Sequence, residues 1–293
     1  MECQEILALA KCELEAMRNR SIDVIDVKRP PNIEYAKQLA KVVSKLSPLV
    51  GNMIEYSVVD LLNARSWNGL GKWIKQDPGF PDAVFQSKLV LPNPGIEIKA
   101  WFPLATEITA RFKDSVKSFM DNNIDMALIA WLPESIIWGR PKIIDVLVTS
   151  GRSVAEARDS HYHNPPDYII FEPEDTKART ANLRQSNTMG YKFQNDKSSI
   201  EEALEVVSSW GEEGRLYSTS PAYQRLLREI QSKFVYRLDT NYAKIDRINH
   251  KEIEEFKSKV LGKKMKHMKI HEWCSILSSK RDTVLKGALN KVI

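Results

Sequence analysis

Residues 80–101 read FPDAVFQSKLVLPNPGIEIKAW, and they carry the most informative pattern of the sequence. It predicts two short strands, one that follows Asp82 and one at residues 95–101. Residues 65–79 are predicted to form a turn-rich loop that leads into the first strand. Because side chains two apart on a strand share a face, Glu97 and Lys99 point together, away from the isoleucines beside them. If the two strands pair, Asp82 joins them at one edge. Two carboxylates and one ammonium then converge, an arrangement that suits Mg²⁺ and a positioned water.

A helix is predicted upstream, at about residues 50–64, from apolar residues at helical spacing. Glu55 lies at the margin of this apolar stripe, one position round from Ile54. Two interpretations of Glu55 are open: it escapes to solvent beside the core, or it faces the two strands as a third carboxylate. The stripe consists of Val50, Met53, Ile54, Val58, Leu61 and Leu62.

The motifs and their order resemble the PD-(D/E)xK nuclease superfamily, which includes most Type II restriction endonucleases. Pro81-Asp82 followed by Glu97-Ile98-Lys99 looks like the signature of that superfamily. Residues 51–55, Gly-Asn-Met-Ile-Glu, resemble the Gly-x-x-x-Glu helix of the MutH-type strand-nicking enzymes and their restriction relatives. The likeness covers about residues 48–132. It implies an α/β fold with a restriction-endonuclease-like mixed central sheet flanked by helices. The residue pattern adds a mostly helical C-terminal part.

The resemblance also implies roles for the residues that match it. Asp82, Glu97, Lys99 and Glu55 are expected to be catalytic. The Asp82 and Glu97 carboxylates, with the main-chain carbonyl of Ile98, would bind Mg²⁺. Lys99 would orient the attacking water and offset charge on the phosphate, and Glu55 would be an outer ligand or orient a metal-bound water. The alternative is an exposed strand face with a cross-strand ion pair, but the apolar neighbours make unpaired charges costly to bury there.

Further elements of the sheet are predicted downstream. Residues 126–132 and 143–148 are near-continuous apolar runs, which are typical of buried strands. Apolar residues at four-residue steps predict a helix over residues 104–119. Arg111 lies on the polar side of this helix and is a candidate contact for a DNA backbone, although a plain solvent-facing role is the alternative.

A long polar loop is predicted at residues 172–194, where no helical or strand period is sustained. Long ordered loops tend to be functional, and this one carries side chains of the kinds that pair with base edges. The alternative is a polar surface loop without a ligand. The candidate DNA-binding residues are Arg179, Asn182, Arg184, Gln185, Asn187 and Lys192.

The C-terminal part is predicted to be helical and basic. Residues 251–293 hold eleven Lys and Arg against five Asp and Glu, a net charge of +6, while the whole chain has a net charge of +5. A basic excess suits phosphate contacts, although a solvated lysine-rich helix face is the commoner meaning. We expect a nuclease core at residues 1–195 and a helical region at 196–293, or one single domain that includes both.

The composition indicates a globular protein without a membrane span. The chain has 293 residues, of which 43% are hydrophobic and 28% charged, as in ordinary globular proteins. No run of about 18 apolar residues occurs, so no membrane span is expected. Cys3, Cys12 and Cys274 are too widely spaced for a zinc signature or a disulfide framework, which suits the cytoplasm.

The expected function is that of a Mg²⁺-dependent, sequence-specific endonuclease of double-stranded DNA, a Type II restriction enzyme. Restriction members of the family usually act as homodimers on short palindromic sites, so a homodimer is implied as well. Two alternatives remain open. One is a MutH-like enzyme that nicks a single strand, and the other is a non-catalytic DNA-binding module on a nuclease fold.

Overall fold

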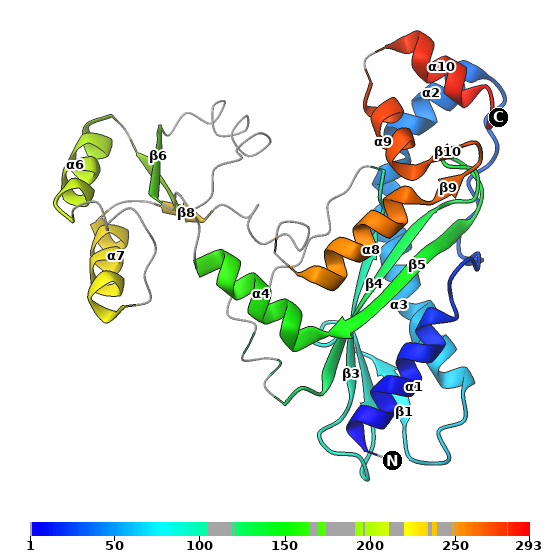
Figure 1. Cartoon of the computed structure of the whole chain (residues 1–293), viewed down its shortest axis with the longest axis horizontal. Helices are drawn as coiled ribbons and strands as arrows, with labels where there is room; N and C mark the ends of the chain where they lie inside the picture. The colour runs from blue at the N-terminus through cyan, green and yellow to red at the C-terminus, as the bar shows by residue number, and fades with distance from the viewer. Residues whose placement is uncertain are drawn as a thin grey trace. The chain divides into compact units, whose positions relative to one another are not determined.

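The computed structural model describes residues 2–104, 116, 119, 121–163, 169–173, 191–195, 197–210, 220–233, 236–238, 248, 250–279 and 281–293. The chain divides into two compact units (Figure 1). Unit 1 consists of Met1–Thr109, Val116–Val154 and His250–Ile293, and unit 2 of Ala110–Ser115 and Ala155–Asn249. The boundary expected between residues 195 and 196 therefore falls inside unit 2, and the basic C-terminal segment belongs to the same unit as the N-terminal strands.

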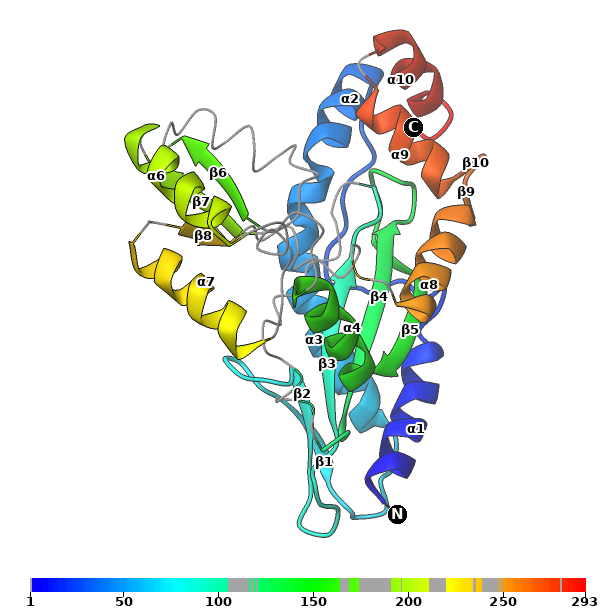
Figure 2. The ribbon, with the colours of Figure 1, turned by 60° about the vertical axis from the view of Figure 1, so that its left-hand side comes forward.

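Unit 1 is built on a mixed sheet of five strands in the order β1-β2-β3-β4-β5. The pairs β1–β2, β2–β3 and β4–β5 are antiparallel, whereas β3 and β4 are parallel and run side by side (Figure 2). Helices pack on the sheet, so the expected mixed α/β architecture with flanking helices is confirmed. The strands are β1 (Lys72–Lys75), β2 (Ala83–Gln86), β3 (Gly95–Trp101), β4 (Ile124–Pro133) and β5 (Pro141–Ser150).

The two apolar runs form the strands that the sequence predicts. β4 and β5 contain the predicted runs at 126–132 and 143–148 and extend one or two residues beyond each end. Their ladder continues from Asp125 opposite Ser150 to Pro133 opposite Pro141, so backbone pairing lengthens both strands past their apolar cores.

β1 was not predicted, because residues 65–79 look like a turn-rich loop. The strand forms because Trp73 is buried against the rings of Trp67 and Phe85, with ring centroids 6.1 and 5.5 Å away. The side-chain amide of Asn63 also accepts from the Trp73 N–H at 2.9 Å and donates to its carbonyl at 2.8 Å. Tertiary packing and the hydrogen bonds from Asn63 thus produce a strand in a segment whose glycines and proline indicate turns.

Helices cover both faces of the sheet. A Cβ placed on Gly51 of α3 would lie 3.6 Å from Cβ of Ala100, whereas the Trp101 ring packs on Phe256 of α8 at 6.1 Å. Because Ala100 and Trp101 are adjacent on β3 and point to opposite faces, α3 and α8 lie on opposite faces. The helices of unit 1 are α1 (Cys3–Glu15), α2 (Ile33–Val42), α3 (Ser47–Ala64), α8 (Lys251–Gly262), α9 (Ile270–Ser278) and α10 (Asp282–Leu289), with a 3₁₀ turn at Val43–Leu46.

The side chain of Asn32 caps α2, since it accepts a hydrogen bond from Tyr35 N–H at 2.9 Å. Pro48 lies in the first turn of α3, where its missing N–H needs no partner. At the other end of the chain, α10 lies beside α2 (Figure 2), and Lys37 of α2 is ion-paired with Asp282 of α10 at 2.5 Å.

One buried carboxylate joins the ends of the chain to the sheet. Asp145 of β5 is fully buried, and three cations surround it: Arg18, which follows α1, Lys259 of α8, and Lys263, which follows α8. Their nitrogens lie 2.7, 2.9 and 2.9 Å from the carboxylate oxygens. Burial alone would raise the pKa of Asp145, but the hydrogen bonds from these cations outweigh burial and hold that pKa well below its usual range.

The C-terminal segment meets the sheet again where unit 1 gives way to unit 2. The Ser153 hydroxyl is hydrogen-bonded to His250 Nε2 at 3.0 Å, and the Thr149 hydroxyl is hydrogen-bonded to Glu252. Ser153 and His250 flank the two places where the chain leaves unit 1 after Val154 and returns to it. This pair therefore ties the entry and the exit of the inserted unit together.

Unit 2 contains a small mixed sheet in the order β6-β7-β8, in which β6 and β7 are parallel and β7 and β8 antiparallel. β7 corrects the prediction of a loop through residue 194. Aromatic and polar residues alternate along the strand, a period of two that the polar run before it obscures. The elements are α4 (Gly151–His163), which begins in unit 1, β6 (Ile169–Pro173), β7 (Tyr191–Asn195), α6 (Lys197–Ser208), α7 (Pro221–Lys233) and β8 (Tyr236–Leu238). Across the described ranges, no helix combines the length and the apolar character needed to cross a membrane.

Candidate active site

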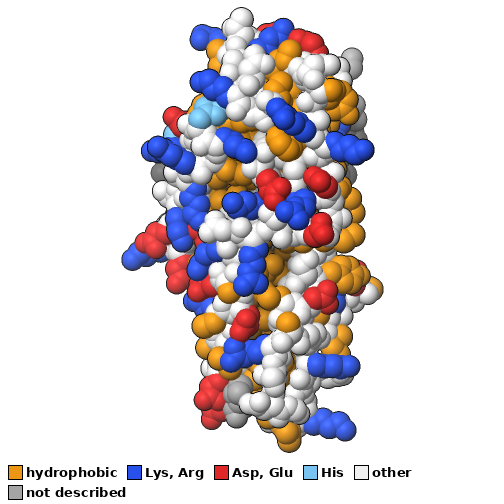
Figure 3. All heavy atoms as spheres, turned by 90° about the vertical axis from the view of Figure 1, so that its right-hand side faces the viewer, with side chains coloured by type: hydrophobic (Ala, Val, Ile, Leu, Met, Phe, Trp, Pro, Cys, Tyr) orange, Lys and Arg blue, Asp and Glu red, His pale blue; other side chains and the backbone are white. Residues whose placement is uncertain are grey.

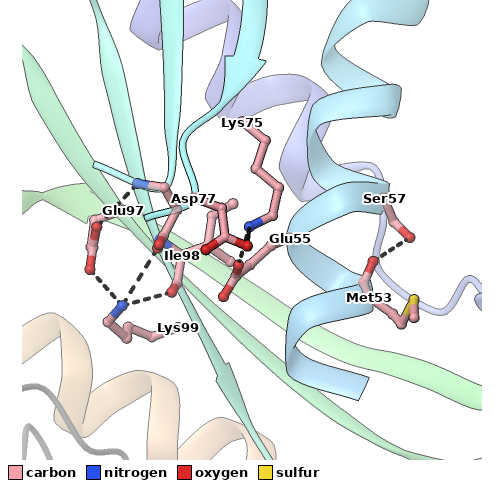
Figure 4. Close-up of polar contacts among 9 residues, drawn as sticks. Met53, Glu55, Ser57, Lys75, Asp77, Glu97, Ile98 and Lys99 are labelled. Carbon is pink, nitrogen blue, oxygen red and sulfur yellow. Dashed lines mark hydrogen bonds and ion pairs between the residues drawn. The ribbon is translucent and has the colours of Figure 1, made fainter. Parts of the chain in front are cut away.

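The site lies where β2 and β3 stop pairing. Ala83 opposite Ile96 is the last residue pair of their antiparallel ladder, and Asp82 comes directly before it. Beyond this pair the Asp82 side chain takes over the role of a backbone partner. Its Oδ2 accepts the Ile98 N–H at 2.7 Å, while the Asp82 N–H donates to Glu97 Oε2 at 3.3 Å (Figure 4). Asp82 is therefore fixed against β3 by hydrogen bonds in both directions.

Gly95 allows this close approach. A Cβ on Gly95 would lie 2.5 Å from Cγ of Pro81 and 3.2 Å from a side-chain carbon of Ile124. Pro81 is buried and directly precedes Asp82. Any side chain at Gly95 would push Pro81, and Asp82 with it, away from β3. The glycine that leads the Glu-x-Lys strand thus has a steric role in the placement of the first carboxylate.

Three oxygens converge on one ammonium at this point. Lys99 Nζ lies 2.5 Å from Glu97 Oε1, 3.0 Å from the Ile98 carbonyl and 3.5 Å from Asp82 Oδ2 (Figure 4). These are the three oxygens that the sequence predicts as metal ligands. The structure brings them together around a single positive charge.

Burial and nearby charges set the protonation states of Glu97 and Lys99. Glu97 is only 5% exposed. Burial raises the pKa of Glu97, the nearby Asp82 adds to that rise, and Lys99 opposes it. Burial would lower the pKa of Lys99, but the negative charges of Glu97 and Asp82 outweigh it, so the Lys99 pKa is raised. Lys99 is therefore held as an ammonium at neutral pH.

Glu55 belongs to the same region but to a second ammonium. It projects from α3, and its Oε2 lies 3.0 Å from Nζ of Lys75 at the end of β1 (Figure 4). Lys75 also lies 3.4 Å from Asp77 Oδ2 and 4.8 Å from the ring centre of Tyr56. The negative charge of Glu55 adds a minor contribution to the raised pKa of Lys99. The solvent interpretation of Glu55 does not hold, because its side chain is only 21% exposed and is ion-paired.

Lys75 and Asp77 are residues of the site that sequence reasoning missed. The signal was present in the tetrapeptide Lys72-Trp73-Ile74-Lys75, whose aromatic and aliphatic residues mark a short strand. Register then places Lys75 opposite Ala83, next to Asp82. A strand of four residues between glycines and prolines is too short for a periodic pattern to stand out.

The residues fit a divalent cation. Glu55, Asp77, Asp82 and Glu97 carry four negative charges against the two positive charges of Lys75 and Lys99, an excess of two. No cluster of three or more His, Cys, Asp or Glu side chains suited to a metal occurs among the described residues. A cation here would therefore be held by two carboxylates and a main-chain carbonyl, with waters completing the oxygen ligands that Mg²⁺ prefers.

Of the predicted DNA-binding residues, only Lys192 lies within the described part of the chain. Lys192 lies in β7 of unit 2 rather than in a loop. The helix predicted over residues 104–119 lies almost entirely outside the described residues. Residues 174–190 of the predicted loop also lie outside them. The remaining candidates, Arg111, Arg179, Asn182, Arg184, Gln185 and Asn187, are all outside them, and their contacts with DNA stay predictions.

Comparison with known proteins adds no relative. No protein-family model, no curated protein and no solved structure matches this chain. The resemblance to the PD-(D/E)xK nucleases therefore rests on the order of the motifs in the sequence and on the geometry of Asp82, Glu97, Ile98 and Lys99.

Proposed function

We propose that the protein is a Mg²⁺-dependent, sequence-specific endonuclease of double-stranded DNA with a restriction-endonuclease-like fold, of the Type II class. One observation carries this proposal. The carboxylates of Asp82 and Glu97 and the carbonyl of Ile98 converge on one cationic group in a half-buried corner of the sheet. An ordinary structural ion pair requires only one acid and one base, whereas this corner holds an excess of acid.

The arrangement of elements supports the same proposal. A helix with Glu55, a short strand after Asp82, and a glycine-led strand with Glu97 and Lys99 follow one another, and an apolar strand parallel to the last completes the series. This is the order of elements that the resemblance implies. Each motif alone occurs often by chance. Here the order of the motifs is accompanied by direct contacts between the residues of the motifs.

The chain's own residues have distinct tasks in this mechanism. Asp82, Glu97 and the Ile98 carbonyl would hold Mg²⁺, which supplies Lewis acidity at the phosphate and a lower pKa for a coordinated water. Lys99 donates hydrogen bonds to the attacking water and offsets the charge that develops on the phosphate. Because its pKa is raised, Lys99 stays protonated and does not serve as the general base.

Glu55 and Lys75 are proposed to act outside the set of groups that would hold Mg²⁺. Lys75 fixes the Glu55 carboxylate between α3 and β1, so that Glu55 can accept a hydrogen bond from a water beside Asp82 and Glu97. The partner is duplex DNA, and the proposal includes a homodimer that matches the two-fold symmetry of a palindromic site. Analytical ultracentrifugation of the protein with and without DNA tests the dimer.

A supercoiled plasmid tests the function directly. Incubation with Mg²⁺ is expected to give linear fragments with discrete ends, and EDTA is expected to abolish them. Mapping the ends on a sequenced viral genome then yields the recognition site. Open circles alone would instead indicate a MutH-like nicking enzyme. A gel shift without any strand break would contradict the enzyme and leave a DNA-binding module.

A further inference from the structure

A second feature of unit 1 is a short basic hairpin near its C-terminal end. β9 (Lys264–Met265) and β10 (Met268–Lys269) pair antiparallel, with Met265 opposite Met268 and Lys269 opposite Lys264. No acidic residue occurs between Lys263 and Ile270 in the sequence. Four basic side chains of the hairpin are exposed: Lys264, Lys266, His267 and Lys269.

Contacts with buried residues hold the backbone of the hairpin in place. Met265 is buried, and its carbonyl accepts a hydrogen bond from Nε1 of the fully buried Trp273 at 3.0 Å. The Ile270 N–H donates to the Lys263 carbonyl at 2.9 Å and closes the base of the hairpin. The His267 ring packs on the edge of Trp273, with centroids 5.2 Å apart. The backbone of this surface feature is thus anchored, and only its basic side chains extend outward.

The hairpin lysines differ from the other lysines of the C-terminal segment. Lys257 is ion-paired with Glu254 at 2.6 Å, and Lys259 and Lys263 are ion-paired with Asp145. Within the described part of the chain, no ion pair joins Lys264, Lys266 or Lys269 to an acidic side chain. These three lysines are therefore engaged with acidic side chains of the chain itself, whereas the hairpin lysines present their charge to the exterior.

The surrounding face is basic as well. Figure 3 shows the side of unit 1 on which β9 and β10 lie, and Lys and Arg side chains outnumber acidic ones over its upper half. A rigid turn with several ammonium groups and no acid suits a polyanion with regularly spaced charges. Lysine is a compact point charge without the planar fork that arginine offers to a base edge, so it matches phosphates rather than base sequence.

We infer that the hairpin at residues 264–269 binds the phosphate backbone of duplex DNA, and that it adds affinity without adding sequence preference. This inference rests on the proposed function, because duplex DNA is its partner. It assigns the basic excess of the C-terminal segment to one anchored element, separate from the residues that would hold the metal and from the loop that would read bases.

The test uses the full chain, a duplex of about 30 base pairs, and EDTA, so that binding is measured without cleavage. The variant K264Q/K266Q/K269Q is compared with K28Q/K88Q/K251Q, which removes the same charge from three other exposed lysines. Fluorescence anisotropy is recorded between about 50 and 200 mM salt, where each lost phosphate contact lowers the slope of log K against log salt by about 0.9. Thermal unfolding of both variants checks that each is folded.

The hairpin variant is expected to lower that slope by about 2–3 and to weaken cognate and non-cognate duplexes alike, whereas the control variant changes it by less than about 1. Equal slopes for the two variants, or a loss confined to the cognate duplex, would overturn the inference. If the parent binds DNA but never cuts it with Mg²⁺, the nuclease proposal fails while the hairpin inference stands. If the parent does not bind duplex DNA at all, both fail.

Discussion

Asp145 and Glu97 are both carboxylates buried in the same sheet, yet their surroundings are opposite. Around Asp145 one acid meets three cations, and the pKa of Asp145 is held well below its usual range. Around Glu97 two acids share the ammonium of Lys99, and burial with Asp82 nearby raises the pKa of Glu97. Asp145 has three positive charges around it, whereas Glu97 shares a single one with Asp82.

The difference separates a structural use of buried charge from a chemical one. A carboxylate paired with three cations joins elements and gains nothing from a further cation, because its negative charge is already balanced. A carboxylate with too little positive charge around it is held in an unfavourable state that a divalent cation would relieve. Substitutions at the two carboxylates, at Asp82 and at Lys75 test this difference.

Asp82→Asn is expected to lower the rate of plasmid cleavage by at least about 10³-fold, equivalent to about 4 kcal/mol. The amide keeps the shape of the side chain but removes the charge that would hold Mg²⁺. Initial rates at saturating Mg²⁺ measure the loss, and DNA binding is expected to stay near that of the parent. Asp60→Asn is the matched control, because Asp60 is an exposed carboxylate of α3 outside the proposed site. Retained cutting by Asp82→Asn would refute the assignment.

Asp145→Asn is expected to lower the free energy of unfolding by about 3 kcal/mol, because three cations lose their shared partner in a buried place. Urea unfolding measures this change, with the exposed Asp121→Asn as control. The cleavage rate per folded molecule is expected to match the parent. A selective loss of cleavage without a loss of stability would show that Asp145 also takes part in the chemistry.

Lys75→Gln is expected to slow cleavage about tenfold, equivalent to about 1.4 kcal/mol, through the loss of the ion pair that fixes Glu55. Lys75→Arg, which keeps the charge, should recover most of the rate. Lys72→Gln, at the exposed end of the same strand, serves as control. The concentration of Mg²⁺ at half-maximal rate should shift in Lys75→Gln alone, whereas a purely structural role for Lys75 would change the melting temperature and leave this concentration unaltered.

Glu97→Gln is expected to change stability with the opposite sign to Asp145→Asn. The pKa of Glu97 is raised in the folded protein, so the stability linked to it is present below its ordinary value of 4.5 and is lost as pH rises. Near pH 7 the glutamine variant should therefore be more stable than the parent by about 1 kcal/mol. The pKa of Asp145 is lowered, so the cost of Asp145→Asn should be full above pH 3.8 and should shrink as pH falls below it. Urea unfolding between pH 3 and pH 8 measures both trends, and trends of equal sign would contradict the contrast.

Much of the sheet and the group of Asp82, Glu97 and Lys99 could be predicted, because local sequence patterns and tertiary structure agree there. Long apolar runs leave β4 and β5 few alternatives. The alternation of Glu97 and Lys99 with isoleucines requires a strand with a polar face, and the position of Asp82 before the paired strand follows from the register.

Other features depended on contacts that no local pattern encodes. β1 exists through the packing of Trp73 and the clamp from Asn63, and without β1 the pairing of Lys75 with Glu55 was invisible. Likewise, the return of residues 250–293 to unit 1 rests on ion pairs with Asp145, more than a hundred residues away. The basic C-terminal run looked like a single surface, but neighbouring lysines proved to have different partners.

The interrupted path of unit 1 has a consequence for how the protein is made. All the residues of the proposed site lie within the first 101, yet the face of the sheet next to Trp101 is covered by α8, which begins at Lys251. At about 5–20 residues per second, a ribosome takes about 10–30 s to translate the intervening chain. During this interval the nascent protein carries its site residues on an unfinished sheet, and the arrival of the last segment sets the earliest moment at which the enzyme can mature.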